Sequence, residues 1–192
     1  CYCTKSSHFS FIVEETLKHD IHLETSYAYD IDIINSLYKK RKINKDIHII
    51  CNGFKQKNYT SRIAKLINDG FKNVIPILDN KEELNMYKRN IRTGEPFKLG
   101  IRIAAEEEPS FPFYTSWLGI EAKDVLEFYV DEIEGNEAKF QLKMLHIFLN
   151  KGIKDDIYYW SELQKSINLY CQLKKICPEL DSINIGGGFP IK

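Results

Sequence analysis

Residues 47–67, IHIICNGFKQKNYTSRIAKLI, contain a short apolar strand, a polar turn and an amphipathic helix in succession. The run 47–51 is rich in β-branched residues, which is typical of a buried strand. Beyond the turn, Tyr59, Ile63, Leu66 and Ile67 recur at the spacing of one helix face. A strand joined to a helix by a short turn is the repeating unit of folds built around a parallel sheet.

The same alternation runs through all 192 residues. Further apolar runs predict strands at residues 1–4, 21–24, 74–78, 98–104, 141–149 and 182–185. Helical spacing recurs in two more stripes that we expect to face the core: Phe9, Ile12, Val13, Thr16 and Leu17, and then Trp160, Leu163, Ile167, Tyr170 and Leu173. Asp79 and Asn80 precede two glutamates and predict a helix start that their side chains cap.

These patterns predict an α/β fold, a (β/α)8 barrel of the TIM type. A complete barrel of this kind needs about 250 residues, so we expect roughly seven βα units within one partial barrel domain, residues 1–192. The chain starts inside a strand with Cys1, and no element closes it after the last predicted strand. We therefore expect a fragment of a longer protein.

The charge balance argues for a small-molecule ligand. Twenty-seven basic residues match twenty-seven acidic ones, which gives no overall electrostatic case for binding nucleic acid or an anionic membrane. The five cysteines lack the spacing of a metal site or a disulfide framework, and this favours a reducing cytoplasm. No apolar run approaches the ~20 residues that span a bilayer.

Lys5 follows the first predicted strand, and Gly186-Gly187-Gly188 follow the last. A lysine amine can bind pyridoxal phosphate as a Schiff base, most readily where burial lowers its pKa, and glycines let a backbone approach a phosphate closely. In a barrel both segments open onto the face at the carboxyl ends of the strands. Two alternatives stay open: a solvated lysine beside an ordinary turn, or a barrel enzyme whose glycines bind the phosphate of a sugar or nucleotide substrate.

Six short segments occur in an order shared with a known family: Tyr2-Cys3-Thr4-Lys5, Leu23-Glu24-Thr25-Ser26, Ile50-Cys51-Asn52-Gly53-Phe54-Lys55, Leu99-Gly100-Ile101-Arg102, Leu145-His146-Ile147-Phe148 and Ile185-Gly186-Gly187-Gly188-Phe189-Pro190. In these segments the chain resembles the fold-type III pyridoxal-phosphate decarboxylases, whose barrel is of the alanine racemase kind. It is most similar to biosynthetic arginine decarboxylases, particularly through the Cys-Asn-Gly-aromatic-Lys motif. The resemblance covers nearly the whole chain.

The resemblance implies decarboxylation of a basic amino acid, with L-arginine converted to agmatine in polyamine and spermidine biosynthesis. It implies that Lys5 is catalytic and binds the cofactor. It also implies that the cofactor phosphate is bound by Gly186, Gly187 and Gly188. Arg102 corresponds to an arginine close to the cofactor, and His146 to the first histidine of a His-aromatic-His strand. Ornithine, lysine or diaminopimelate as substrate stays open, as does a non-catalytic barrel that binds pyridoxal phosphate.

The alternative for Arg102 is an ion pair with a neighbouring carboxylate, and for His146 a hydrogen-bonded place in the core. The chain also departs from the family pattern. Phe148 replaces the second histidine, which in the family stacks on the cofactor ring and which we expect the phenyl ring to mimic. Asn150-Lys151 replace a Gly-Ser pair, and Trp117 stands where a basic residue is common.

The family's acidic partner for the pyridine nitrogen lies beyond the glycine run, outside these 192 residues. So do its C-terminal β domain and the residues that complete the site across a dimer interface. The resemblance therefore implies a homodimer or higher homo-oligomer in the full-length protein, with Mg2+ as an optional further cofactor. We expect the isolated 192 residues to be inactive.

Overall fold

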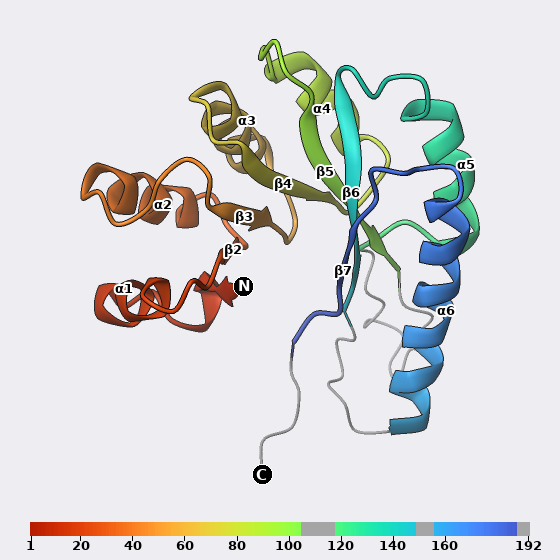
Figure 1. Ribbon diagram of the computed structural model, residues 1–192, viewed down its shortest axis with the longest axis horizontal. Coiled ribbons are helices and arrows are strands. Elements are labelled where there is room, and N and C mark those ends of the chain that lie inside the picture. Colours follow the sequence, from red (N-terminus) through yellow and green to blue (C-terminus); the bar gives the residue numbers. More distant parts are fainter. Residues whose placement is uncertain (105–117, 149–155, 188–192) are drawn as a thin grey trace. The chain divides into compact units, whose positions relative to one another are not determined.

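The computed structural model describes residues 1–104, 118–148 and 156–187 (Figure 1). Within these ranges seven strands follow one another in the sheet in chain order, from β1 to β7. The pairs β1–β2, β2–β3, β3–β4 and β6–β7 are parallel. This order is the one expected when every strand is joined to its neighbour by a helical crossover.

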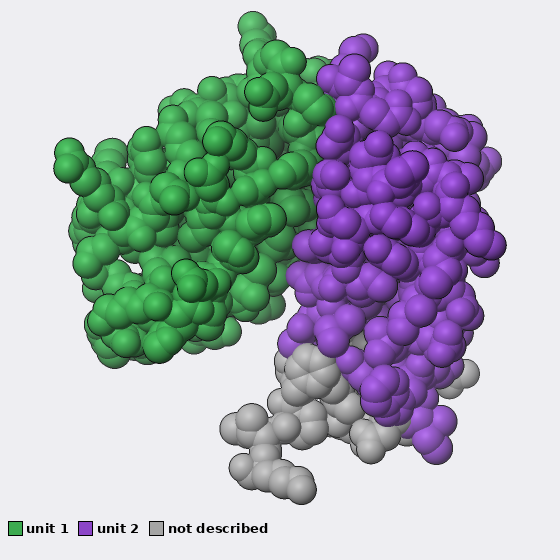
Figure 2. Space-filling view, viewed as in Figure 1, with its two compact units in different colours: residues 1–77, 82–99 green, residues 78–81, 100–192 purple. Residues whose placement is uncertain are grey.

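The chain divides into two compact units, residues 1–77 with 82–99 and residues 78–81 with 100–192 (Figure 2). The elements that belong wholly or mainly to the first unit are β1 Tyr2–Cys3, the 3-10 helix η1 Thr4–Ser6, α1 Ser10–Leu17, β2 Leu23–Thr25, α2 Asp30–Lys39, β3 His48–Cys51, α3 Lys57–Asn68, β4 Asn73–Leu78 and α4 Glu83–Asn90. Those of the second unit are β5 Phe97–Ile103, whose first three residues lie in the first unit, α5 Ala122–Glu132, β6 Phe140–Ile147, α6 Asp156–Lys174 and β7 Ser182–Asn184.

The seven strands lie where the apolar runs predict them, with ends shifted by one or two residues. The predicted core stripe of α3 is also confirmed, since Tyr59, Ile63, Leu66 and Ile67 are all buried. All its apolar side chains point to one side, so the sequence admits a single face for burial. None of the helices in the described ranges is long and apolar enough to cross a membrane.

The predicted core stripe before β2 is wrong at its first position. Phe9 is 67% exposed, because it occupies the extended N-cap position of α1, outside the helical repeat. Its ring stacks on that of Phe11 with centroids 5.8 Å apart. Within the stripe only Val13 is fully buried.

The predicted core stripe of α6 is wrong over most of its length. Trp160 is 63% exposed and Ile167 is 37% exposed, whereas Leu173 is fully buried as expected. The buried face consists of Tyr159, Glu162, Ser166, Leu169 and Leu173. It includes two polar residues because each has a partner within the helix: Glu162 accepts a hydrogen bond from Lys165 at 2.8 Å, and Ser166 donates to the Glu162 carbonyl at 3.0 Å. A prediction from apolar residues alone therefore assigns burial to the neighbouring face of the helix, the one that carries Trp160 and Ile167.

The helix after β4 has Glu82, and not Asp79 or Asn80, as its N-cap residue. Helix α4 begins at Glu83, and its N-cap residue Glu82 makes no side-chain cap hydrogen bond. Asp79 is 1% exposed, and its carboxylate pairs with Arg102.

Candidate active site

Lys5 lies in η1, directly after β1. The neighbouring Thr4 takes the buried position, and its hydroxyl donates to the Glu24 carbonyl at 3.0 Å. Thr4 turns inward, and the adjacent Lys5 is exposed in the part of the chain that the structure describes. The structure therefore presents this lysine in an accessible position at the carboxyl end of a strand.

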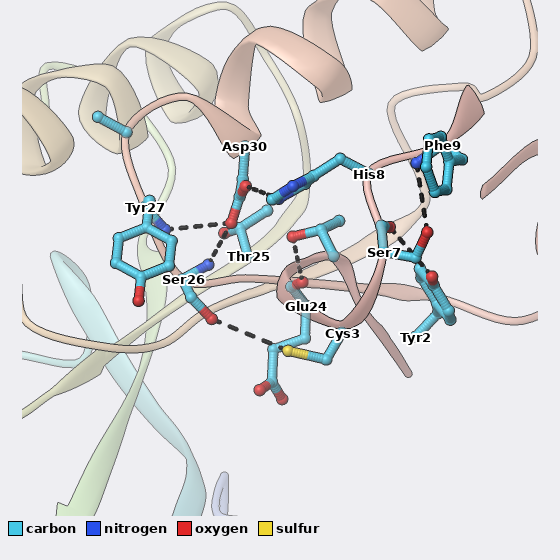
Figure 3. A network of polar contacts seen from close by, with 12 residues as sticks. Tyr2, Cys3, Ser7, His8, Phe9, Glu24, Thr25, Ser26, Tyr27 and Asp30 are labelled. Atoms are coloured by element: carbon cyan, nitrogen blue, oxygen red, sulfur yellow. Dashed lines mark hydrogen bonds and ion pairs between the residues drawn. The ribbon is translucent and has the colours of Figure 1, made fainter. Parts of the chain in front are cut away.

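A polar network fixes the segment that follows Lys5 (Figure 3). Its centre is the buried carboxylate of Asp30 at the start of α2. One oxygen accepts hydrogen bonds from the backbone N–H groups of Ser26 at 2.7 Å and Tyr27 at 3.1 Å. The other oxygen lies 3.0 Å from Nε2 of His8. A single charged side chain therefore ties the loop after β1 to the loop after β2.

Cys3 and Ser26 lie close to each other at the carboxyl ends of β1 and β2. The Cys3 sulfur lies 3.8 Å from the Ser26 hydroxyl (Figure 3). Burial raises the pKa of the Cys3 thiol and the charge of Glu24 raises it further, whereas the hydrogen bond from Ser26 and the charge of Lys5 lower it. The charges of Glu24 and Lys5 thus act on the Cys3 thiol in opposite directions.

The Cys51–Lys55 motif forms the turn after β3. Gly53 has a φ of +78°, and a Cβ there would lie 2.8 Å from the Ser26 carbonyl oxygen, so only glycine fits. The Lys55 amine donates to the Gly53 carbonyl at 2.8 Å and pairs with Glu83 at 3.3 Å, with both side chains buried. Lys55 is therefore held in a structural ion pair, while Lys5 stays accessible.

Arg102, on β5 in the second unit, is 5% exposed. Its Nη1 lies 3.8 Å from Oδ1 of Asp79, which confirms the alternative of an ion pair with a neighbouring carboxylate. The guanidinium carbon also lies 5.6 Å from the centroid of the Phe148 ring, within cation–π range. Two predicted site residues, Arg102 and Phe148, are thereby in contact.

The Gly186 turn lies close to Phe148. Gly186 has a φ of +72°, and a Cβ there would come within 2.9 Å of both the Ile147 carbonyl oxygen and the Phe148 ring. Its N–H donates to the Asn184 side chain at 2.9 Å. Asn184 in turn stands opposite His146 in the β6–β7 register, and His146 is 1% exposed.

Gly187 differs from Gly186, because no heavy atom of the described residues lies within 4 Å of the place where its Cβ would be. Its backbone therefore faces open space of the kind that a phosphate needs in order to approach. The arrangement fits a cofactor phosphate at the second glycine, with the first glycine shaping the turn. Gly188, Trp117 and Asn150-Lys151 lie outside the described residues.

The second unit thus brings together Arg102, His146, Phe148 and Gly186-Gly187, while Lys5 belongs to the first unit. Each unit is described by itself, so the approach of Lys5 to the glycine run stays a prediction. Among the described residues no group of three or more His, Cys, Asp or Glu side chains is placed to hold a metal ion.

Four residues that contact or neighbour the predicted site residues are not themselves predicted as site residues from the sequence: Glu24, Asp30, Asp79 and Asn184. Three of them offer a signal, since Glu24 and Asn184 lie in the last residues of strands and Asp79 directly follows one. In parallel α/β folds this edge of the sheet is where ligands bind. Asp30 offers less, because an acid in the first turn of a helix is common for electrostatic reasons alone.

No protein-family model matches the chain. Among curated proteins, a biosynthetic arginine decarboxylase of Prochlorococcus marinus (strain AS9601) is 29% identical over 157 residues, which cover 77% of this chain and 24% of the relative. The biosynthetic arginine decarboxylase of Phocaeicola vulgatus is 22% identical over 204 residues, covering 99% of this chain and 31% of the relative. The chain thus spans 24–31% of the length of these two relatives.

Solved structures show the same fold at low sequence identity. Lysine decarboxylase from Selenomonas ruminantium superimposes with a TM-score of 0.76 at 15% identity, over 99% of this chain and 46% of that protein. Diaminopimelate decarboxylase from Helicobacter pylori gives 0.76 at 16% identity, over 100% and 48%. The arginine decarboxylase of Paramecium bursaria Chlorella virus gives 0.66 at 12% identity, over 98% and 47%.

These neighbours confirm the predicted fold, an alanine racemase-like TIM barrel represented here by seven strands. The chain is therefore similar in sequence to the biosynthetic arginine decarboxylases and has the fold of the fold-type III pyridoxal-phosphate decarboxylases, as its motifs predict.

Proposed function

We propose that this chain forms most of the pyridoxal-phosphate-binding barrel of an amino-acid decarboxylase that converts L-arginine to agmatine. The observation that carries the proposal is the similarity to proteins named biosynthetic arginine decarboxylase over 77% of the chain. The accessible Lys5 at the end of β1 and the open backbone at Gly187 supply the two attachment points that such a cofactor needs.

In this proposal Lys5 holds the cofactor covalently, and the Asp30 network keeps the lysine loop in place. Gly187 and Gly188 receive the phosphate, and Gly186 sets the turn that presents them. Arg102, oriented by Asp79 and Phe148, supplies a fixed positive charge. When bound, pyridoxal phosphate withdraws electrons from the substrate bond that breaks as carbon dioxide leaves.

The choice of arginine rests on the names of the curated relatives. Solved structures with the same fold include lysine and diaminopimelate decarboxylases, so these substrates and ornithine are the competing candidates. A non-catalytic barrel that binds pyridoxal phosphate would release no carbon dioxide from any of the four. A barrel that binds a sugar or nucleotide phosphate would leave Lys5 unmodified.

The substrate test measures carbon dioxide release by the whole protein, loaded with pyridoxal phosphate, from arginine, ornithine, lysine and diaminopimelate. We expect the highest kcat/KM for arginine, by at least tenfold, and its loss in Lys5→Ala. Lys57→Ala, which removes an exposed lysine of the same unit, should retain activity. A preference for another of the four amino acids would contradict the assignment of arginine as the substrate, while the assignment as an amino-acid decarboxylase would stand. No release from any of them would contradict the catalytic proposal.

We also propose a cytoplasmic protein that assembles as a homodimer or larger homo-oligomer, with a C-terminal β domain outside these residues. The five cysteines are free thiols, which suits a reducing compartment. The proposal assigns no residue to Mg2+.

A further inference from the structure

We propose that the opposite end of the first unit carries a second binding site, for a small anion attached to an apolar or aromatic body, such as a nucleoside phosphate. The site is a groove of about 970 Å3 lined by the end of α1, the end of α2 and the segments that lead into β2 and β3. Lys5 follows a strand, whereas every segment lining this groove precedes a strand or ends a helix. In a parallel sheet these are opposite edges, so the groove is distinct from the proposed cofactor site.

The charge of the groove selects an anion. Its lining includes the cations Lys39, Arg41, Lys42 and Lys45 against two carboxylates, Asp20 and Asp46. Asp46 is already paired with Lys72 at 2.9 Å, outside the lining. The positive excess is local, since the chain as a whole has no net charge. It also disfavours arginine or agmatine as the ligand, because their cationic groups would be repelled.

Two of these cations have no competing partner. Lys42 pairs with Glu14 at 3.0 Å, and the Lys45 amine donates to the Asp69 carbonyl at 2.5 Å. Lys39 and Arg41 form no ion pair within the described ranges, and both are exposed. Their charges are therefore available to a ligand.

The backbone of Arg41 is the second, independent observation. Its φ is +57°, in the left-handed region, and it stands just beyond the end of α2. The Lys42 N–H donates to the Leu37 carbonyl at 2.9 Å, which closes the helix with the turn that usually has glycine at this position. An arginine there carries a conformational cost that glycine would avoid, as does Asp20, which also lines the groove and has a φ of +54°.

Part of the lining of the groove is apolar. Ile21 and Tyr38 line it and remain 39% and 40% exposed, and Ile43 and Ile47 complete it. An inorganic ion would leave these side chains in water, whereas a ligand with an apolar or aromatic body would cover them. The volume is that of a small-molecule pocket, for which about 300–1,000 Å3 is usual.

The alternative without a ligand is that the cations only offset the negative ends of the helix dipoles of α1 and α2. Arg41→Gly separates the two accounts. It removes the charge and at the same time relieves the left-handed strain, so the variant should fold at least as stably as the parent. A loss of binding in this variant cannot then be attributed to unfolding.

The test titrates ATP, pyrophosphate and adenosine separately into the whole protein, without added metal, by isothermal calorimetry at low ionic strength. We expect ATP to bind at least tenfold more tightly than either part alone. Arg41→Gly and Lys39→Ala should each weaken ATP binding at least fivefold. Arg89→Ala, which removes an exposed arginine on α4, and Lys5→Ala, at the cofactor site, should leave it within twofold of the parent.

Four results would overturn the proposal, and the first three are no ATP binding, equal binding by Arg41→Gly and the parent, and equal binding of ATP and pyrophosphate. Equal binding of ATP and pyrophosphate would show that the apolar residues of the lining contribute nothing to the affinity. A loss of ATP binding in Lys5→Ala but not in Arg41→Gly would place the nucleotide at the cofactor phosphate site instead, and would likewise overturn it.

Discussion

At the scale of single residues, the two described glycines of the Gly186-Gly187 pair have different tasks. Gly186→Ala would force a Cβ against the Ile147 carbonyl oxygen at a positive φ, which should lower the free energy of unfolding by about 1–2 kcal/mol. Gly187→Ala meets no neighbour among the described residues, so it should change stability little but weaken cofactor binding by narrowing the open space. Thermal denaturation and pyridoxal-phosphate titration of both variants measure these effects. Equal loss of stability in the two variants would contradict the division of roles.

Cys51 provides a pH-dependent prediction at the same scale. Burial raises the pKa of its thiol to about 12, so the group stays protonated while an ordinary thiol ionises near pH 8–9. Cys1 and Cys171 are exposed. Iodoacetamide should therefore alkylate the exposed Cys1 and Cys171 in the folded protein, while Cys51 resists alkylation at pH 7–9 and reacts only after denaturation. Peptide mass spectrometry distinguishes the sites, and rapid native labelling of Cys51 would contradict its burial.

At the scale of elements, α6 shows which side chains the unit buries. Leu173→Ala removes a fully buried side chain and should destabilise the protein by about 2–4 kcal/mol. Trp160→Ala removes a larger side chain that is 63% exposed, and should cost less than about 0.5 kcal/mol. Urea denaturation of both variants measures the difference. A larger loss of stability in Trp160→Ala than in Leu173→Ala would indicate that the apolar face predicted from the sequence is the buried one.

The elements also show how far the sequence leads. Strands could be predicted because their β-branched runs are short and bounded by turns, and α3 because its apolar residues share one face. The buried face of α6 could not, since Glu162 and Ser166 find partners inside the helix that a hydropathy pattern does not register. In the candidate site the sequence indicates Arg102 and Phe148, but their contact with each other and with Asp79 depends on tertiary structure.

At the scale of the whole molecule, the order of seven strands places Lys5 at the end of the first and the glycines at the end of the last. In a parallel barrel the carboxyl ends of all strands open onto the same face. We propose, as the central claim, that Lys5 binds the aldehyde cofactor covalently and that the glycine run binds its phosphate.

The most direct test of that claim is borohydride reduction of the whole protein after loading with pyridoxal phosphate, followed by peptide mapping of the labelled lysine. The account predicts one labelled residue, Lys5, with labelling lost in Lys5→Ala and requiring more cofactor in Gly187→Ala. Label on Lys55 or another lysine, or no label at all, would contradict it.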